Sequence, residues 1–297
     1  MEGLSDTVES RIRALPCWHG PISLEPLKGG LSNVSFRVVE EGGRRAVVRV
    51  GEDFPFHHVS RTREAAASRA AHAAGLSPGV IHDEPGLMVL EFIDGRTFGE
   101  ADVRDNVAAC ADLLKRCHRD LARHVRGPAQ IFWVFHVLRD YAATLEKAGH
   151  RNRPQLAEWM KAAERLEASQ APLPIVFGHH DLLPTNFLDD GRRLWLIDWE
   201  YGGFGTAMFD LANIAANASF GPVEEDALLG AYFGGALDPA VRRSFEAMKA
   251  ASALREAMWA MVSELFLDSP GVDYVAHGDE FIGRFVRLVT AFERGDK

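Results

Sequence analysis

The chain has 297 residues, 47% of them hydrophobic and 25% charged, enough to bury a large core in one or two domains. A net charge of −9, without a Lys/Arg-dense stripe, argues against a nucleic-acid-binding protein. The N-terminus lacks the basic and apolar regions of a signal peptide, and no apolar run approaches membrane-spanning length. Three cysteines without a CxxC pair favour a reducing compartment. We therefore expect a cytoplasmic monomer or homodimer that binds neither nucleic acid nor membranes.

The first third of the chain reads as β-rich, with one main helix. Residues 33–50 contain two alternating apolar runs joined by the turn letters EGG, a pattern that predicts a β-hairpin. In the second run Val47 and Arg49 share one face of the strand. The Ala-rich stretch 60–74 predicts a helix, and GLMVLEFIDG at 86–95 predicts a short buried strand that ends in a turn.

Helical patterns dominate from residue 98 onward. The segment 105–125 spaces its apolar residues by threes and fours, which predicts one amphipathic helix. Residues 131–147 and 154–169 read as two further helices, and helices resume near Phe209 after a stretch of short strands and loops. This change of pattern predicts an α+β fold in two parts.

The boundary between these parts falls near Asp94-Gly95. We expect a small antiparallel-β lobe with one main helix at residues 1–94, and a larger, mainly helical lobe at residues 95–297.

The letters HRDL at 118–121 are those with which the catalytic loop of a protein kinase begins. Such a loop needs an Asn five residues after its Asp, to hold magnesium. Five residues after Asp120 stands Val125, which has no metal-binding atom. We therefore expect HRDL to lie inside the helix 105–125, with His118 and Asp120 bracing the larger lobe or facing solvent.

The segment GHHDLLPTNF at 178–187 has the Asn five residues after an Asp that HRDL lacks. Asn186 follows Asp181 by five residues, and a turn and an apolar strand, DDGRRLWLID, then lead to Asp198. Phosphoryl transfer needs a carboxylate to orient the attacking hydroxyl and accept its proton, and oxygen ligands for Mg²⁺ on the phosphates. Asp181 suits the first role, and Asn186 and Asp198 suit the second. Each residue alone would read as a turn or strand-end residue, but the ordered set favours catalysis.

These motifs resemble the choline/ethanolamine kinase branch of the aminoglycoside-phosphotransferase-like, protein-kinase-like superfamily. GHHDLLPTNF is similar to the superfamily motif HxDxxxxN, and LIDWEYGG to the family's IDxEY segment. The resemblance also takes in GGLSN at 29–33, VVRV at 47–50, FDLAN at 209–213 and a helix around Trp259, so it spans about residues 29–267. It implies a two-lobed protein-kinase-like fold and a kinase that uses ATP and Mg²⁺ to phosphorylate the hydroxyl of a small cationic alcohol.

The resemblance also implies an ATP site in the smaller lobe. Arg49, where most kinases of this fold carry Lys, would hold the α- and β-phosphates and pair with Glu64. The loop over the phosphates would consist of Gly29, Gly30, Ser32 and Asn33. The adenine site would be formed at the lobe junction and on the strands before it, by Val47, Met88, Glu91, Phe92 and Ile93.

For the acceptor, the resemblance implies choline or ethanolamine. A quaternary ammonium is held by aromatic faces and by carboxylate charge, and Glu200, Tyr201 and Trp259 match family positions near such a site. Tyr274 and Phe220 are looser candidates. FDLAN contributes Asp210, which the superfamily uses to brace its catalytic loop.

One departure from related kinases argues against a class of enzyme, and another keeps alternative acceptors open. Asp181 has no Lys two residues later and Asp198 begins DWE rather than DFG, which argues against a protein kinase. Eukaryotic choline kinases place a second Trp where this chain has Val262, which thins the predicted aromatic cage. Thiamine or an aminoglycoside therefore stays an alternative acceptor, and a non-catalytic kinase-like binding protein stays an alternative of another class.

Overall fold

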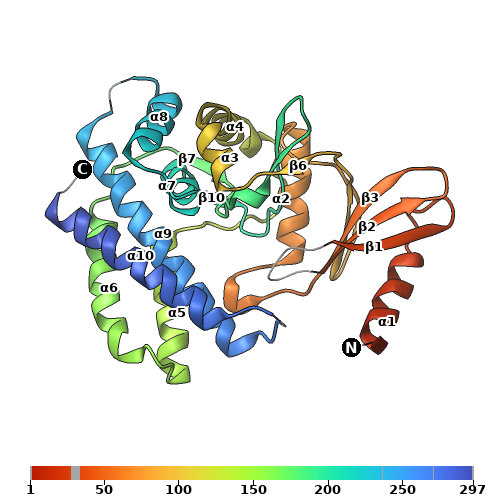
Figure 1. Ribbon diagram of the computed structural model, residues 1–297, viewed down its shortest axis with the longest axis horizontal. Helices are drawn as coiled ribbons and strands as arrows, with labels where there is room; N and C mark the ends of the chain where they lie inside the picture. The colour runs from red at the N-terminus through yellow and green to blue at the C-terminus, as the bar shows by residue number, and fades with distance from the viewer. Residues whose placement is uncertain (1, 28–33, 236, 270, 296–297) are drawn as a thin grey trace.

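The computed structural model describes the chain except for residues 1, 28–33, 236, 270 and 296–297. The predicted phosphate loop, Gly29, Gly30, Ser32 and Asn33, lies outside the described residues. Figure 1 shows a sheet-rich part that carries the N-terminus and a larger helical part that carries the C-terminus. The predicted α+β class is confirmed.

Five antiparallel strands form the main sheet, in the order β1-β2-β3-β5-β4. The strands are β1 (Ile22–Leu27), β2 (Val34–Glu40), β3 (Arg45–Val50), β4 (Val80–Glu84) and β5 (Leu87–Glu91). The pair β2–β3 is the predicted hairpin, with Ser35 opposite Arg49. Ala46 and Val48 pack into one apolar cluster and Val47 contacts another, so the predicted alternation of faces is confirmed.

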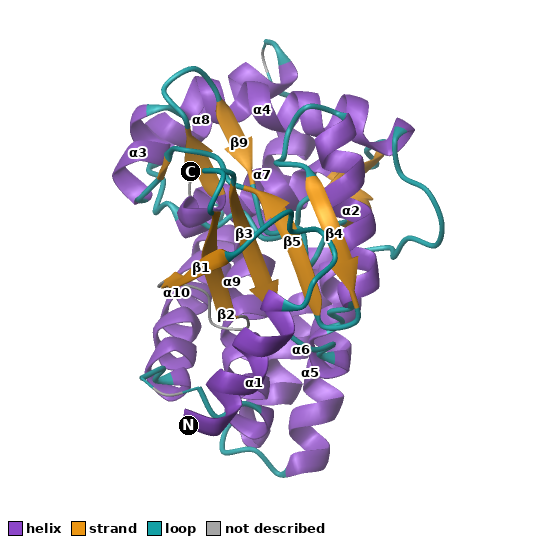
Figure 2. Ribbon diagram, turned by 90° about the vertical axis from the view of Figure 1, so that its right-hand side faces the viewer, coloured by secondary structure: helices purple, strands orange, loops and turns teal. Residues whose placement is uncertain are grey.

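Two helices contact opposite faces of this sheet, one of them only near one end of the strands (Figure 2). Helix α2 (Arg61–Ala73) is the predicted one, and its Ala65 packs with Met88 and Leu90. Helix α1 (Glu2–Arg13) was not predicted, and its Ile12 packs on the opposite face. The apolar stripe of α1 is sparse, so its sequence pattern is weak and its burial depends on the sheet.

The larger part is built around one long helix. Helix α9 (Pro239–Phe266) packs against α5, α6, α7 and α10, and many alanines along it let these neighbours approach closely. The surrounding helices are α3 (Glu100–Asp105), α4 (Val107–Asp120), α5 (Val134–Ala148), α6 (Arg153–Ala168), α7 (Ala207–Asn217), α8 (Pro222–Phe233) and α10 (Tyr274–Arg294). Among the helices of the described residues, none is both long and apolar enough to cross a bilayer.

Short strands lie where the two parts meet. Strands β8 (Phe187–Asp189) and β9 (Leu194–Leu196) form the hairpin that the turn DDGRR predicted. Strand β6 (Arg96–Thr97) pairs with β8, which fastens the chain to this hairpin directly after the sheet. Strands β7 (Ile175–Gly178) and β10 (Gly203–Thr206) form a separate pair. We propose the lobe boundary between residues 94 and 95, in the segment that joins β5 to β6.

The helix expected at 105–125 is shorter than predicted. Helix α4 ends at Asp120, and a 3-10 turn follows at Leu121–Arg123, with Leu121 buried as expected. The apolar spacing continues to Val125, but the chain turns ahead of Gly127-Pro128, residues that do not continue a helix. HRDL therefore lies at a helix end rather than inside the helix.

Candidate active site

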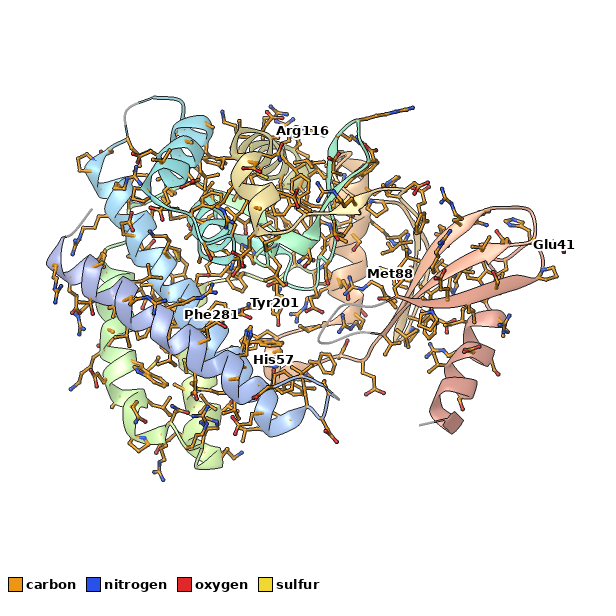
Figure 3. The ribbon with its side chains drawn as sticks, in the orientation of Figure 1. Glu41, His57, Met88, Arg116, Tyr201 and Phe281 are labelled. Atoms are coloured by element: carbon orange, nitrogen blue, oxygen red, sulfur yellow. The ribbon has the colours of Figure 1, made fainter. Side chains whose placement is uncertain are left out.

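A cleft of about 610 Å³ lies between the main sheet and the helical part, and the three predicted catalytic residues line it. Asp181, Asn186 and Asp198 contribute from the loops around β7–β9. Val47 contributes from the sheet and Trp259 from α9. Figure 3 shows Tyr201 near the centre of the molecule and Met88 beside the sheet. Residues far apart in the sequence therefore meet at one cavity.

The loop that carries Asp181 is held by a buried carboxylate from α7. Asp210 accepts hydrogen bonds from the backbone N–H groups of His179 and His180 at 2.8 Å each. It also bonds the Nε2 of His118 at 2.9 Å. Burial opposes its ionisation, but the hydrogen bond from His118 and the surrounding imidazoles hold the pKa of Asp210 well below its usual range. The bracing role implied for Asp210 is confirmed.

Asp181 itself is close to a cation that faces it from α9. Its carboxylate lies 3.6 Å from Nη1 of Arg255, and its backbone carbonyl accepts a hydrogen bond from Nδ2 of Asn186 at 2.8 Å. Burial raises the pKa of Asp181 well above its usual range, although the Arg255 charge acts in the opposite direction. A buried carboxylate of raised proton affinity is suited to take a proton from an attacking hydroxyl.

Asp198 follows β9 in a strained backbone conformation. Its φ of +69° is in the left-handed region, which costs a residue other than glycine about 1–2 kcal/mol. Its Oδ1 accepts from Arg49 at 2.8 Å, and the side chain keeps 28% of its surface exposed toward the cleft. Asn186 donates its amide N–H to the backbone carbonyl of Asp181, so its amide oxygen is the atom that could bind a metal ion. A carboxylate and an amide oxygen on one cleft fit Mg²⁺.

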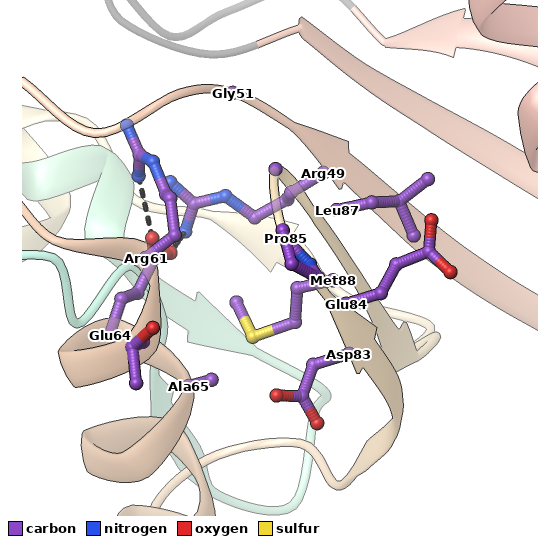
Figure 4. A pocket seen from close by; sticks show the side chains of 12 residues that line it. Arg49, Gly51, Arg61, Glu64, Ala65, Asp83, Glu84, Pro85, Leu87 and Met88 are labelled. Carbon is purple, nitrogen blue, oxygen red and sulfur yellow. Dashed lines mark hydrogen bonds and ion pairs between the residues drawn. The ribbon is translucent and has the colours of Figure 1, made fainter.

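A chain of alternating charges extends from Asp198 to Glu200. Glu64 of α2 pairs with Arg49 at 2.9 Å, which is the ion pair expected between these residues. Arg61 pairs with Glu64 at 2.6 Å and with Glu200 at 3.1 Å. Figure 4 shows Arg49, Arg61 and Glu64 together at a second, smaller cavity of about 190 Å³. Burial and the neighbouring Asp198 raise the pKa of Glu200 to about 7, against the charge of Arg49.

The residues expected around adenine divide into two groups. Val47, Phe92 and Ile93 line the large cleft. Met88 lies on the same face of the sheet as Val47 and Leu90, but opposite Arg49, and it lines the smaller cavity beside Arg49 and Glu64. Glu91 lines the cleft, but both its backbone N–H and its carboxylate bond Gly79. We therefore locate the proposed adenine contact at Phe92 and Ile93.

The predicted aromatic cage is partly filled by the chain's own side chains. Tyr201 and Trp259 line the cleft and are joined by a hydrogen bond of 3.1 Å from the indole N–H to the phenolic oxygen. The Arg255 guanidinium lies over the Tyr201 ring, 4.4 Å from its centroid. His57 stacks on Trp259 with centroids 5.2 Å apart and 22° between the planes. Tyr274 meets Trp259 edge to face at 6.0 Å.

Two other substrate candidates have different surroundings. Glu200 lines the cleft, but it is also part of the ion-pair chain through Arg61. Phe220 follows α7 and packs against the main hydrophobic core. Glu200 therefore joins the ion pairs of Arg61, Glu64 and Arg49 to the cleft that Tyr201 lines, whereas Phe220 is not among the residues that line this cleft.

Sequence reasoning missed two residues that line the cleft and a third that packs against one of its walls. Arg255 and Glu256 precede Trp259 by one helical turn, so helical spacing would have placed them beside it. Both line the cleft. His57 comes from the loop after β3, and no sequence signal connects it to a helix two hundred residues away.

A family model described as the phosphotransferase enzyme family matches residues 23–248. This chain belongs to that family. The resemblance inferred from its motifs is therefore confirmed. The loops that carry Asp181, Asn186 and Asp198 lie within the matched residues, as does the main sheet apart from Ile22.

Two curated relatives carry more specific names. A probable ethanolamine kinase of Arabidopsis thaliana is 30% identical over 208 residues, which are 64% of this chain and 55% of that protein. The protein LicA of Haemophilus influenzae is 25% identical over 213 residues, 69% of this chain and 61% of that protein. The chain therefore spans a little over half the length of these relatives.

Solved structures agree on the fold. A choline/ethanolamine kinase family protein from Mesorhizobium loti superposes with a TM-score of 0.76 at 28% identity, covering 97% of this chain and 98% of that one. The choline kinase LicA of Streptococcus pneumoniae superposes with a TM-score of 0.78 at 20% identity, covering 97% and 99%. The predicted kinase-like fold is confirmed.

Proposed function

We propose that this chain is an ATP- and Mg²⁺-dependent kinase that transfers the γ-phosphate to the hydroxyl of a small cationic amino alcohol, choline or ethanolamine. The observation that carries this proposal is the meeting of Asp181, Asn186 and Asp198 with Arg49 on one cleft. The names of the relatives support the acceptor class. We further propose a cytoplasmic monomer or homodimer.

Each residue has a role that its geometry supports. Asp181 orients the acceptor hydroxyl and takes its proton. Asn186 and Asp198 hold Mg²⁺, which, when bound, neutralises charge on the β- and γ-phosphates. Arg49, fixed between Glu64 and Asp198, holds the α- and β-phosphates. Catalysis of this kind consists of positioning and charge stabilisation, and the ion-pair chain supplies both.

The proposal is tested by ATP consumption with Mg²⁺ against ethanolamine, choline, thiamine and aminoglycosides. We expect turnover on an amino alcohol, and the Asp181→Ala variant should lose it while it keeps the wild-type unfolding midpoint. Turnover of thiamine or an aminoglycoside, without turnover of an amino alcohol, would show that the acceptor belongs to that class instead. Measurable ATP binding without turnover on any acceptor would favour a non-catalytic binding protein, and full activity of Asp181→Ala would refute the role of Asp181.

A further inference from the structure

The acceptor end of the cleft contains a buried cation. Only 2% of the Arg255 side chain is exposed, and its Nη1 lies 3.0 Å from Glu256 and 3.6 Å from Asp181. Its Nε and Nη2 are buried without a hydrogen-bond partner among the described residues. Such unsatisfied groups cost stability, so their presence at a cleft indicates a functional reason for this side chain. The guanidinium covers one face of the Tyr201 ring.

One face of Trp259 is covered as well. The stacked His57 ring is held on both sides, by the hydroxyl of Tyr141 at 3.0 Å and that of Ser263 at 2.8 Å. Burial and the charge of Arg255 lower the pKa of His57 to about 3, so the ring is neutral at physiological pH. The aromatic surface that a quaternary ammonium needs is therefore reduced on both candidate rings.

A carboxylate remains able to receive hydrogen bonds at this end. Glu256 lines the cleft and pairs with Arg255 and with Nε2 of His277, at 3.0 Å each. These two contacts use about half of the lone-pair positions of a carboxylate. Because one nitrogen of Arg255 contacts both Glu256 and Asp181, the two carboxylates are near enough for one small molecule to reach both.

We propose that Arg255 is a specificity-determining residue, which makes the site select an acceptor with a primary ammonium over one with a quaternary ammonium. A primary ammonium donates N–H groups to Glu256 while its hydroxyl meets Asp181. A quaternary ammonium has no N–H to donate and needs the ring faces that Arg255 and His57 occupy. This inference rests on the proposed function, because it assigns the two ends of the same acceptor.

The test is the ratio of kcat/KM for ethanolamine to that for choline, together with the dissociation constant of each acceptor from calorimetry. We expect the wild type to favour ethanolamine about tenfold or more, an effect of the size of one cation–π contact. Arg255→Ala should move the ratio about tenfold toward choline, because the uncovered Tyr201 ring can then contact a quaternary ammonium. Arg255→Lys, which keeps the cation but not the planar group over the Tyr201 ring, should move the ratio in the same direction by a smaller factor.

A matched control exists on the same helix. Arg243 lies over Phe292 at 4.1 Å, away from the cleft, and Arg243→Ala should leave the ratio unchanged. The inference would be overturned if Arg255→Ala left the ratio unchanged, or if Arg243→Ala shifted it equally. Turnover of an amino alcohol in these same assays would still support the proposed function. If neither acceptor is turned over, the proposed function is rejected. The ratio of the two dissociation constants from calorimetry, compared between the wild type and Arg255→Ala, would then test the role of Arg255 by itself.

Discussion

Two segments of this chain, HRDL at 118–121 and HHDL at 179–182, differ in one letter and have different environments. Asp120 lies at the end of α4, paired with the neighbouring Arg119, with 27% of its side chain exposed. Asp181 lies on a buried loop after β7, beside the cleft. Of the two aspartates, Asp181 lies outside regular secondary structure at a cavity, where a ligand could reach its carboxylate, whereas Asp120 ends a helix and pairs with its neighbour.

The two segments are also connected. His118 of the first bonds Asp210, and Asp210 holds the backbone of His179 and His180 in the second. His180 has a φ of +63°, a conformation that costs free energy and that these bonds maintain. The first segment thus supports the loop that carries the proposed base.

The largest expected effect separates the two aspartates directly. Asp181→Asn removes the proton acceptor, so kcat should fall about 10²- to 10⁴-fold, the usual contribution of a general base. The change is measured by steady-state turnover of the best acceptor, with the unfolding midpoint as a check on folding. A variant that keeps more than about a tenth of wild-type kcat would contradict the assignment.

The next effect tests the connection through Asp210. Asp210→Asn places an amide against backbone donors, so the free energy of unfolding should drop by about 3–5 kcal/mol. Urea unfolding at neutral pH measures this loss. A loss below about 1 kcal/mol would show that the loop does not depend on the carboxylate.

Because of the same carboxylate, we expect the free energy of unfolding to decrease at acidic pH. The pKa of Asp210 is lower in the folded state than its unfolded value of about 3.9, so the folded state binds its proton less readily. The stabilisation is fully present above the unfolded pKa and is lost as pH falls through the folded one. Between about pH 5 and pH 2, Asp210→Asn should therefore lose less unfolding free energy than the wild type. Parallel pH profiles of the two proteins would contradict this.

A smaller effect is expected from the histidine of the first segment. His118→Ala removes one bond to Asp210 and leaves the hydroxyl of Tyr232, now 2.7 Å from Nδ1, without this partner. Stability should fall by about 1–3 kcal/mol, and kcat by less than tenfold because both backbone bonds to Asp210 remain. Tyr232→Phe is the matched control, with an expected loss of about 1 kcal/mol. A His118→Ala enzyme as inactive as Asp181→Asn would give the first segment a direct catalytic role.

The smallest effect is expected at Asp120. Its partner is an exposed arginine, and such ion pairs contribute about 0–1 kcal/mol. Asp120→Asn should keep turnover within about twofold of wild type and change the unfolding free energy by less than about 0.5 kcal/mol. A tenfold loss of turnover in the same assay would remove the contrast between the two segments.

Much of the fold could be predicted from local pattern. The β2–β3 hairpin, helix α2 and the β8–β9 hairpin follow from turn residues and apolar periodicity, which act over a few residues. Helix α1 was missed because its packing surface is provided by the sheet. The end of α4 was misplaced because apolar spacing does not report where the backbone turns.

The sequence by itself determined that Asp181, Asn186 and Asp198 lie close together. Their order and spacing place them on one short loop and one hairpin, whose lengths fix how far apart the three side chains can be. Only the tertiary structure decided what surrounds them. Arg255 and His57 come to lie beside Tyr201 and Trp259, at the proposed acceptor end, because α9 packs against a distant loop, and no local pattern encodes that contact. A motif places its own side chains through short-range geometry. Which ring faces of the cleft remain open to a substrate depends on the side chains from distant segments that pack against those rings.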